Sequence, residues 1–228
     1  MNKNGFTLIE ALMVTSIFTF LLGALLSILT SSDQAWRAGY DKLTEQHEAR
    51  RSLNRISVVL RESNPDWIGL FQAEEIEIEK VLGDENIIRI EHIGSTAVPN
   101  LKAKPTIDIL LEVPETSDKN EVIEALTRLD YHYIPRPENP APHMMFVKGY
   151  TTNGFKGQAY HIHVRYSGDW DELYFRDYLK SNPGIAQEYS DLKVRLAEEY
   201  RNDRDGYTES KTDFIKRITE IARKKKAD

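Results

Sequence analysis

Hydrophobic positions are continuous in the first part of the chain and periodic in the rest. Residues 6–29 are apolar or small, apart from the single acid Glu10. As a helix, this run would be about 36 Å long, which is enough to cross the hydrocarbon core of a bilayer. An ionisable side chain is costly in such a segment, so Glu10 points to a function. The pattern predicts one membrane-spanning helix.

Helical periodicity continues beyond this run. One stripe of side chains recurs at spacings of three and four residues: Trp36, Tyr40, Leu43 and His47. Asn64 precedes Pro65, and a residue before proline is biased away from helical angles. These positions predict a single helix over residues 6–63, about 87 Å long, with a change of structure at Asn64.

After Pro65 the pattern changes between helical and strand periods. Helices are predicted at residues 65–83, 120–130, 169–180, 184–201 and 208–226. Strands are predicted at residues 87–93, 105–113, 144–150 and 158–166, the last two joined through a loop at 153–154. The run 105–113 is nearly all apolar, which is typical of a strand buried on both faces. The fold class is therefore α+β.

Charge and cysteine content narrow the functional classes. The chain of 228 residues carries 30 basic and 36 acidic residues, a net charge of −6. We therefore expect no nucleic-acid partner, because such proteins normally present a basic face. The sequence has no cysteine, which excludes disulfides, thiolate chemistry and cysteine-based zinc sites.

The first candidate for chemistry is a strand–turn–strand segment at residues 90–113. Gly94 and Ser95 follow the first strand, and Asp108 lies on the second. Glycine lets backbone amides approach a phosphate, and a carboxylate suits a hard cation. Leu110 occupies the next position on the face of Asp108, where a second acid would help to hold metal ions, and Glu112 lies about 13 Å along the strand. Lys104 is a candidate phosphate ligand, with a simple solvated lysine as the alternative.

A second candidate lies on the last predicted strand. His161 and His163 are two residues apart, so their side chains share one face, and Arg165 continues that face toward an anionic ligand. If a neighbouring strand carries Asp108, the histidines fall beside it, and His92 on the earlier strand could join them. Imidazoles with one carboxylate suit a transition metal better than magnesium. The alternative is a pair of hydrogen-bonded histidines in a half-buried sheet.

The order of residues 5–10, GFTLIE, resembles the N-terminus of type IV pilins and pseudopilins. The resemblance implies a leader at 1–5, cleavage by a prepilin peptidase between Gly5 and Phe6, and methylation of the new N-terminus. It also implies a spine helix at 6–63, with Glu10 neutralising the terminal amine of a neighbouring pilin or pseudopilin subunit. A signal peptide or a plain anchor is the alternative. The positive-inside rule places Lys3 in the cytoplasm. The helix would then cross the inner membrane once, with the C-terminal domain outside the cytoplasm.

Residues 64–228 resemble the GrpB family, also known as UPF0157. The resemblance rests on the blocks EHIGSTAVP, AKPTIDIL, YHIHV, FRDYL, YSDLKVRLA and ESKTDFI. It implies a nucleotidyltransferase-like core, which is a mixed sheet flanked by helices. In this core Gly94 and Ser95 would contact phosphates and Asp108 would hold magnesium, with Asp108 and Ser95 as catalytic candidates. The implied ligand is a nucleotide or a CoA-like phosphate compound. The family also occurs fused to dephospho-CoA kinases, where a folding or accessory role has been proposed.

Two functional classes follow from these two resemblances. The first is a nucleotide- or CoA-binding module with metal-dependent activity, although Leu110 argues against ordinary nucleotidyl transfer. The second is a structural minor pilin that displays an inactive or accessory domain. A GrpB-like domain alone is expected in the cytoplasm, whereas a pilin exposes its C-terminal part outside. A natural gene fusion and an erroneous join of two reading frames both explain a junction near Asn64.

Overall fold

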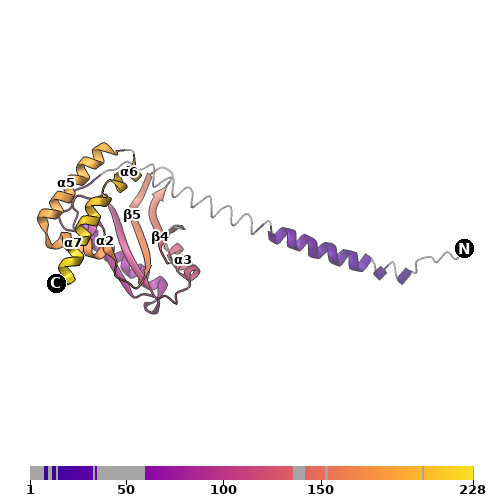
Figure 1. Cartoon of the computed structure of the whole chain (residues 1–228). Coiled ribbons are helices and arrows are strands. Elements are labelled where there is room, and N and C mark those ends of the chain that lie inside the picture. The colour runs from indigo at the N-terminus through magenta and orange to yellow at the C-terminus, as the bar shows by residue number, and fades with distance from the viewer. Residues whose placement is uncertain are drawn as a thin grey trace. The chain divides into compact units, whose positions relative to one another are not determined.

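The structure is a computed structural model that describes residues 8–9, 12–13, 15–32, 34, 60–135, 142–151, 154–201 and 203–227. The chain divides into two units, Met1–Glu45 and Gln46–Asp228, whose placement relative to one another is not determined (Figure 1). Each unit is therefore considered by itself.

The described part of the first unit is helical. Thr15–Ser32 is long and apolar enough to cross a membrane, by length and composition. Its hydroxyl groups bond to the helix itself: Ser16 donates to the carbonyl of Leu12 at 2.8 Å, and Thr30 to that of Leu26 at 3.0 Å. The backbone of the helix therefore satisfies these two hydroxyls, as is needed for polar groups on an apolar surface. An apolar helix is confirmed here, and its membrane insertion stays a prediction. Gly5, Phe6, Glu10 and residues 35–59 lie outside the described residues.

The helix predicted to reach Ser63 is not present at residues 60–63. Arg61 forms an isolated antiparallel bridge with Ala103. The amide of Arg61 donates to the carbonyl of Ala103 at 2.7 Å, and the amide of Ala103 donates back at 3.0 Å. Because both backbone groups of Arg61 pair with Ala103 and not along a helix, this part of the prediction is wrong.

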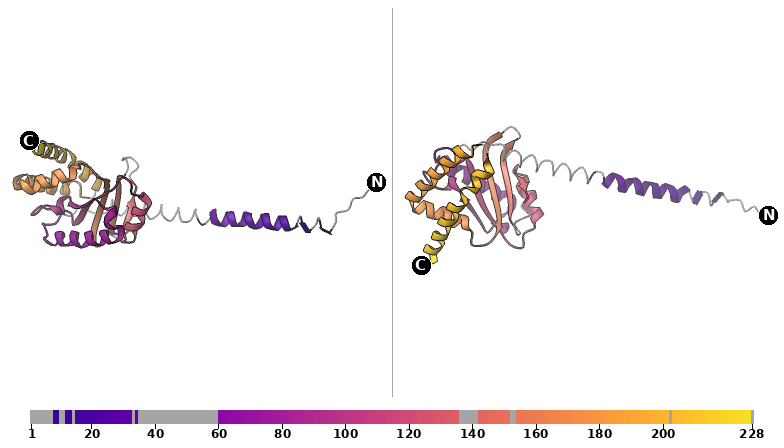
Figure 2. Two further views of the ribbon diagram at one scale, coloured as in Figure 1. Left: turned by 90° about the horizontal axis from the view of Figure 1, so that it is seen from below. Right: turned by 45° about the horizontal axis from the view of Figure 1, so that its top comes forward.

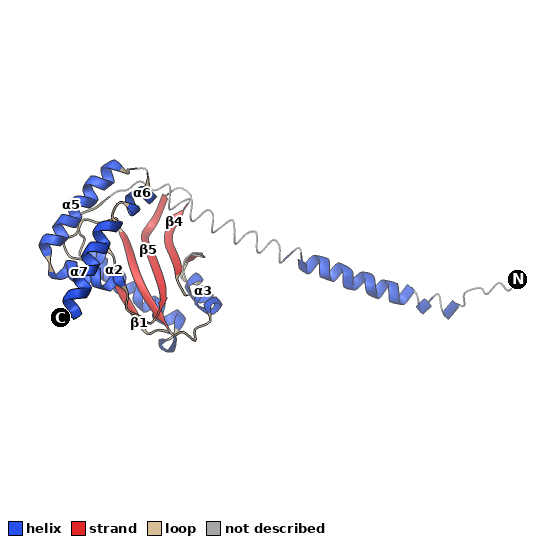
Figure 3. Ribbon diagram, viewed as in Figure 1, coloured by secondary structure: helices blue, strands red, loops and turns tan. Residues whose placement is uncertain are grey.

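A five-stranded mixed sheet forms the centre of the second unit, in the order β1-β2-β5-β4-β3 (Figure 3). The strands are β1 (Arg89–Ile93), β2 (Thr106–Val113), β3 (His132–Ile134), β4 (Met144–Thr151) and β5 (Gly154–Tyr166). Only β2 and β5 are parallel, and the other neighbours are antiparallel. β3 is an addition to the prediction, since three residues are too few for an alternating pattern to be recognised. The parallel central pair brings residues near 108 and 161 side by side.

Two helices pack on one face of this sheet: α2 (Asp66–Leu82) and α3 (Lys119–Thr127). In Figure 2 they lie together on one side of the strands. α2 begins after Pro65 and ends at Gly83, whose φ of 80° stops the helix, as predicted. Asp118 caps α3, because its carboxylate accepts the amide of Asn120 at 2.6 Å. Apolar side chains from α2, α3 and the central strands form the main core.

Four helices end the chain: α4 (Asp171–Ser181), α5 (Pro183–Glu199), α6 (Arg204–Glu209) and α7 (Thr212–Ala227). The helix predicted over residues 208–226 is confirmed from Thr212 onward, but its start is wrong, because residues 208–209 belong to the separate helix α6. Asp203 starts α6 early, since its side chain accepts the amide of Gly206 at 2.9 Å. A second core forms where these helices meet the loop after β1, from Val98, Leu101, Leu179, Ala186, Tyr189, Phe214 and Ile218.

Candidate functional site

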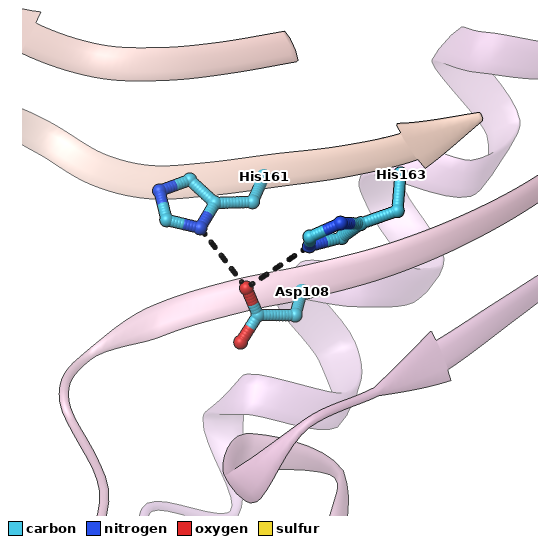
Figure 4. A group of neighbouring side chains, drawn as sticks. All are labelled: Asp108, His161 and His163. Carbon is cyan, nitrogen blue, oxygen red and sulfur yellow. Dashed lines mark hydrogen bonds and ion pairs between the residues drawn. The ribbon is translucent and has the colours of Figure 1, made fainter. Parts of the chain in front are cut away.

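Asp108, His161 and His163 come together on the two parallel strands. In the register of β2 and β5, Asp108 pairs with His161, and Leu110 pairs with His163. Figure 4 shows both imidazoles directed at the carboxylate: Asp108 Oδ1 is 3.1 Å from His161 Nδ1 and 3.9 Å from His163 Nε2. One ligand atom from each residue lies within 4.8 Å of the others, a spacing at which a metal ion could be held. Their role as metal ligands stays a prediction.

The carboxyl group of Asp108 is ionised over the whole physiological range. Burial raises the pKa of Asp108, but the hydrogen bonds and charges of His161 and His163 outweigh that effect and hold it well below its usual range. The side chains of Asp108 and His163 are still 28% and 26% exposed, so a ligand can approach from solvent. The cluster thus offers an anionic oxygen and two ring nitrogens at an accessible position.

Gly94 is required by the position of Asp108. Its φ is +71°, a conformation that favours glycine, and a Cβ there would lie 2.6 Å from Asp108 Oδ2. The loop after β1 therefore passes directly against the carboxylate. Gly94 was predicted to let backbone approach phosphate, and the structure adds a second reason for glycine at this position.

Ser95 contacts a buried lysine that the sequence interpretation missed. Lys193 of α5 is 2% exposed. Its ammonium donates to Ser95 Oγ at 3.0 Å and to the carbonyl of Lys102, and lies 4.6 Å from the ring centre of Tyr189. Among the described residues, no carboxylate forms an ion pair with Lys193. Burial, followed by the charge of Lys211, lowers the pKa of Lys193 to about 7.

The sequence held one signal for Lys193. It follows Tyr189 by four residues and precedes Leu196 by three, which places it on the buried stripe of α5. A lysine on such a stripe is unusual, because a buried ammonium is costly without an acidic partner.

Lys104 shares an aromatic contact with Lys211, the residue whose charge acts on Lys193. Its ammonium is 4.5 Å from the ring centre of Tyr207, and Lys211 lies 4.2 Å from the same ring. Tyr207 is 1% exposed, so the two cations share a buried aromatic support. Three of the predicted phosphate ligands, Gly94, Ser95 and Lys104, therefore belong to the region around the Ser95–Lys193 contact.

Arg165 lies away from the cluster. In the strand register it pairs with Glu112, four residues along from Asp108. Its guanidinium is 3.6 Å from Glu172 and lies over the ring of Trp170. Arg165 therefore contacts the start of α4. Glu112, already judged a poor second acid, is buried and paired with Arg89.

His92 is also outside the cluster. It pairs with Ile109 in the sheet, so its side chain lies on the opposite face from Asp108. The ring stacks on Phe71 with centroids 4.9 Å apart, and Nε2 lies 3.0 Å from the hydroxyl of Thr96. Burial lowers the pKa of His92 to about 4. A metal bound by Asp108 would not have His92 as a ligand, because the two side chains lie on opposite faces of the sheet.

Comparison with known proteins gives matches to both parts of the chain. Residues 57–221 match the family described as GrpB protein, and residues 1–26 match the prokaryotic N-terminal methylation motif. A glutamate-rich protein GrpB of Alkalihalophilus pseudofirmus is 34% identical over 73% of this chain and 96% of its own length. A UPF0157 protein of Pseudomonas aeruginosa is 40% identical over 68% of this chain and 64% of its own.

A structural relative agrees with these sequence matches. The crystal structure of conserved protein GrpB from Enterococcus faecalis is 32% identical, covers 75% of this chain and 100% of its own, and has a TM-score of 0.63. A dephospho-CoA kinase of Mycobacterium leprae matches at 27% identity over 67% of this chain and 43% of the kinase, in line with the predicted association. A more remote match, to the Cid1 poly(U) polymerase, has 11% identity and a TM-score of 0.42, too distant to support an activity.

Proposed function

This chain belongs to the GrpB family, and from that premise we propose that its C-terminal domain binds a phosphate-bearing small molecule beside a divalent metal ion. The observation that carries the proposal is the convergence of Asp108, His161 and His163 within 4.8 Å. A nucleotide or a CoA-like compound is the ligand class that the Gly94–Ser95 loop favours. More specifically, we propose that this site transfers a phosphoryl or nucleotidyl group.

The donor set favours a transition metal over magnesium. Magnesium prefers octahedral oxygen ligands, whereas two imidazoles and one carboxylate are common ligands of zinc and of non-haem iron. Leu110 is fully buried where a second carboxylate would serve a two-metal site. One bound metal would supply Lewis-acid chemistry, which polarises a phosphate oxygen or activates a water molecule.

The phosphate would bind on the side of the Ser95–Lys193 contact. Lys193 is buried without an acidic partner among the described residues, and such an ammonium is stabilised by a bound anion. Ser95 Oγ already accepts a hydrogen bond from it and has its own hydrogen to donate to a phosphate oxygen. Gly94 lies directly against the Asp108 carboxylate and precedes Ser95 in this loop. One phosphate-bearing ligand could therefore contact both the metal at Asp108 and the ammonium of Lys193.

Metal analysis of the purified full-length chain in detergent tests the metal site. We expect about one transition-metal ion per chain, lost in the double variant His161→Ala/His163→Ala. His132→Ala is the matched control and should retain the ion. A wild-type chain that holds no ion after incubation with Zn²⁺, Co²⁺, Mn²⁺ or Mg²⁺ would refute the proposal.

Ligand binding is tested separately. Pyrophosphate, ATP and CoA should raise the thermal midpoint of the wild-type chain, and this rise should be lost in Lys193→Met. The same rise in both proteins would remove Lys193 from the ligand site.

A second candidate function is favoured by the methylation motif at residues 1–26. In this function the chain is a minor pilin or pseudopilin, processed by a prepilin peptidase and anchored in the inner membrane by the helix that includes Thr15–Ser32. Mass spectrometry of membrane fractions should then detect a peptide that begins with N-methylated Phe6. Peptides from residues 66–228 found only in soluble fractions would favour two separate proteins.

A further inference from the structure

The backbone of β4 is irregular close to the Asp108 cluster. Lys148 pairs with Tyr160, but Tyr150 pairs with Phe155, so the register shifts between these two positions. Gly149 lies between them with a φ of +85°, and a Cβ on it would lie 2.2 Å from the carbonyl oxygen of Gln158. Only glycine fits this position without a backbone shift.

The irregularity changes the face to which Tyr150 belongs. In a regular strand, Tyr150 would share a face with Lys148, two residues before it. Lys148 instead binds Glu74 of α2 at 2.7 Å, on the α2 face. Tyr150 packs with Val147 on the other face, which is the face of His161. The left-handed Gly149 therefore directs the Tyr150 side chain toward His161.

Tyr150 makes a direct contact with His161. The hydroxyl oxygen lies 2.8 Å from His161 Nε2, and the two rings stack with centroids 5.6 Å apart and an angle of 18° between them. The other ring nitrogen, Nδ1, is the atom directed at Asp108. Both nitrogens of His161 are thus engaged, one by the carboxylate and one by the phenol.

We propose that Tyr150 is a positioning residue that allows His161 to bind a metal ion through Nδ1. The inference rests on the proposed metal site. In the metal-free chain an ionised Asp108 only accepts hydrogen bonds, so the neutral form of His161 carries its proton on Nδ1, and its Nε2 accepts the hydroxyl hydrogen of Tyr150. A metal on Nδ1 takes the place of that proton, and the neutral ring then carries its proton on Nε2.

A hydroxyl group suits both states of His161. It donates to a bare Nε2 and, after rotation about the C–O bond, accepts from Nε2–H. A carbonyl would serve only the second state and an ammonium only the first. Tyr150 therefore keeps the ring oriented while its proton moves from Nδ1 to Nε2 by exchange with solvent, and the net charge of the ring does not change.

Co²⁺ binding to the full-length chain in detergent tests this role, with Tyr150→Phe as the variant. Phenylalanine keeps the ring stacking and removes only the hydroxyl. We expect Co²⁺ affinity to fall about 10–100-fold, with a changed visible spectrum of the bound ion. Tyr150→Gln, whose amide also donates or accepts, should recover part of the affinity. Tyr133→Phe is the matched control, since the ring of Tyr133 packs at a tilt against Phe146, away from the cluster.

A readout on the metal-free chain separates positioning from folding. The ¹⁵N resonances of the His161 ring should shift in Tyr150→Phe and stay unchanged in Tyr133→Phe, while the thermal midpoints of all three proteins remain close. Equal Co²⁺ affinity in wild type and Tyr150→Phe would overturn the role of Tyr150 alone. A wild-type chain that binds none of Co²⁺, Zn²⁺, Mn²⁺ and Mg²⁺ would overturn the proposed metal site, and this role with it.

Discussion

Polar side chains are buried on both faces of the sheet, and the two faces treat charge differently. On the α2 face, Lys148 binds Glu74 at 2.7 Å and lies over the rings of Tyr131 and Tyr160. Burial and the nearby Glu74 carboxylate raise the pKa of Tyr160 to about 12, so it stays neutral. This cluster pairs its charges internally and is covered by a helix.

The opposite face covers and pairs its polar groups less fully. The Asp108–His161–His163 cluster is partly open to solvent. Beyond it, Lys193 is buried with no acidic partner among the described residues. A paired, covered cluster is explained by the stability of the fold, whereas an open cluster beside an uncompensated cation costs stability unless a ligand completes it. The comparison teaches that a proposed ligand site is best supported on the face whose charges are not balanced within the domain.

Breaking the closed cluster should give the largest effect. Glu74→Ala leaves Lys148 without its partner, and we expect the free energy of unfolding to fall by about 3 kcal/mol, because a part-buried ammonium loses its compensation. Urea unfolding followed by near-ultraviolet circular dichroism measures this change. Glu77→Ala, which removes the exposed pair with Lys80 on the same helix, should change it by less than about 0.5 kcal/mol. Similar losses in both variants would contradict the comparison.

Displacing the loop at the open cluster should have an intermediate effect. Gly94→Ala strains a left-handed backbone and drives a Cβ against the carboxylate of Asp108. We expect the free energy of unfolding to fall by about 2 kcal/mol, together with weaker Co²⁺ binding. Gly184→Ala in α5, where a Cβ meets nothing within 4 Å, is the control and should not destabilise the chain. Unchanged Co²⁺ affinity in Gly94→Ala would separate this loop from the metal site.

Removing the uncompensated cation should give the smallest effect and the opposite sign. Lys193→Met should raise the free energy of unfolding by about 1–2 kcal/mol near pH 6.5. The pKa of Lys193 is about 7 in the folded chain and about 10.4 when unfolded. Between these values the unfolded state holds the extra proton, so wild-type stability rises with pH and the advantage of Met shrinks toward pH 10. Unfolding at pH 6.5 and 9 measures it, and a destabilised Met variant at pH 6.5 would show that Lys193 supports the fold.

Local sequence was sufficient for most helices and strands of the domain. The helix between Pro65 and Gly83 has a start and a stop signal, and the run at residues 105–113 reads as a buried strand. The common face of His161 and His163 follows from their spacing alone. These features depend on neighbours in the chain, and so a single sequence contains them.

Long-range contacts decided the rest. Helical spacing continued to Ser63, but Arg61 pairs with Ala103. This partner is 42 residues away in the chain, so local spacing does not indicate it. His92 was grouped with the other histidines because their types match, and the antiparallel register places it on the opposite face. Tyr150 was missed because regular alternation assigns it to the face of Lys148, and only the irregular backbone at Gly149 turns it to His161.

The amino-acid sequence by itself determined the apolar N-terminal helix, the α+β class and the residue types that metal and phosphate chemistry would use. Tertiary structure alone decided that Asp108 meets His161 and His163, that Lys193 reaches Ser95 from α5, and that Arg165 does not join them. The physical reason is that side-chain periodicity is a local property of the backbone. The register between β2 and β5 instead results from packing between segments more than 50 residues apart.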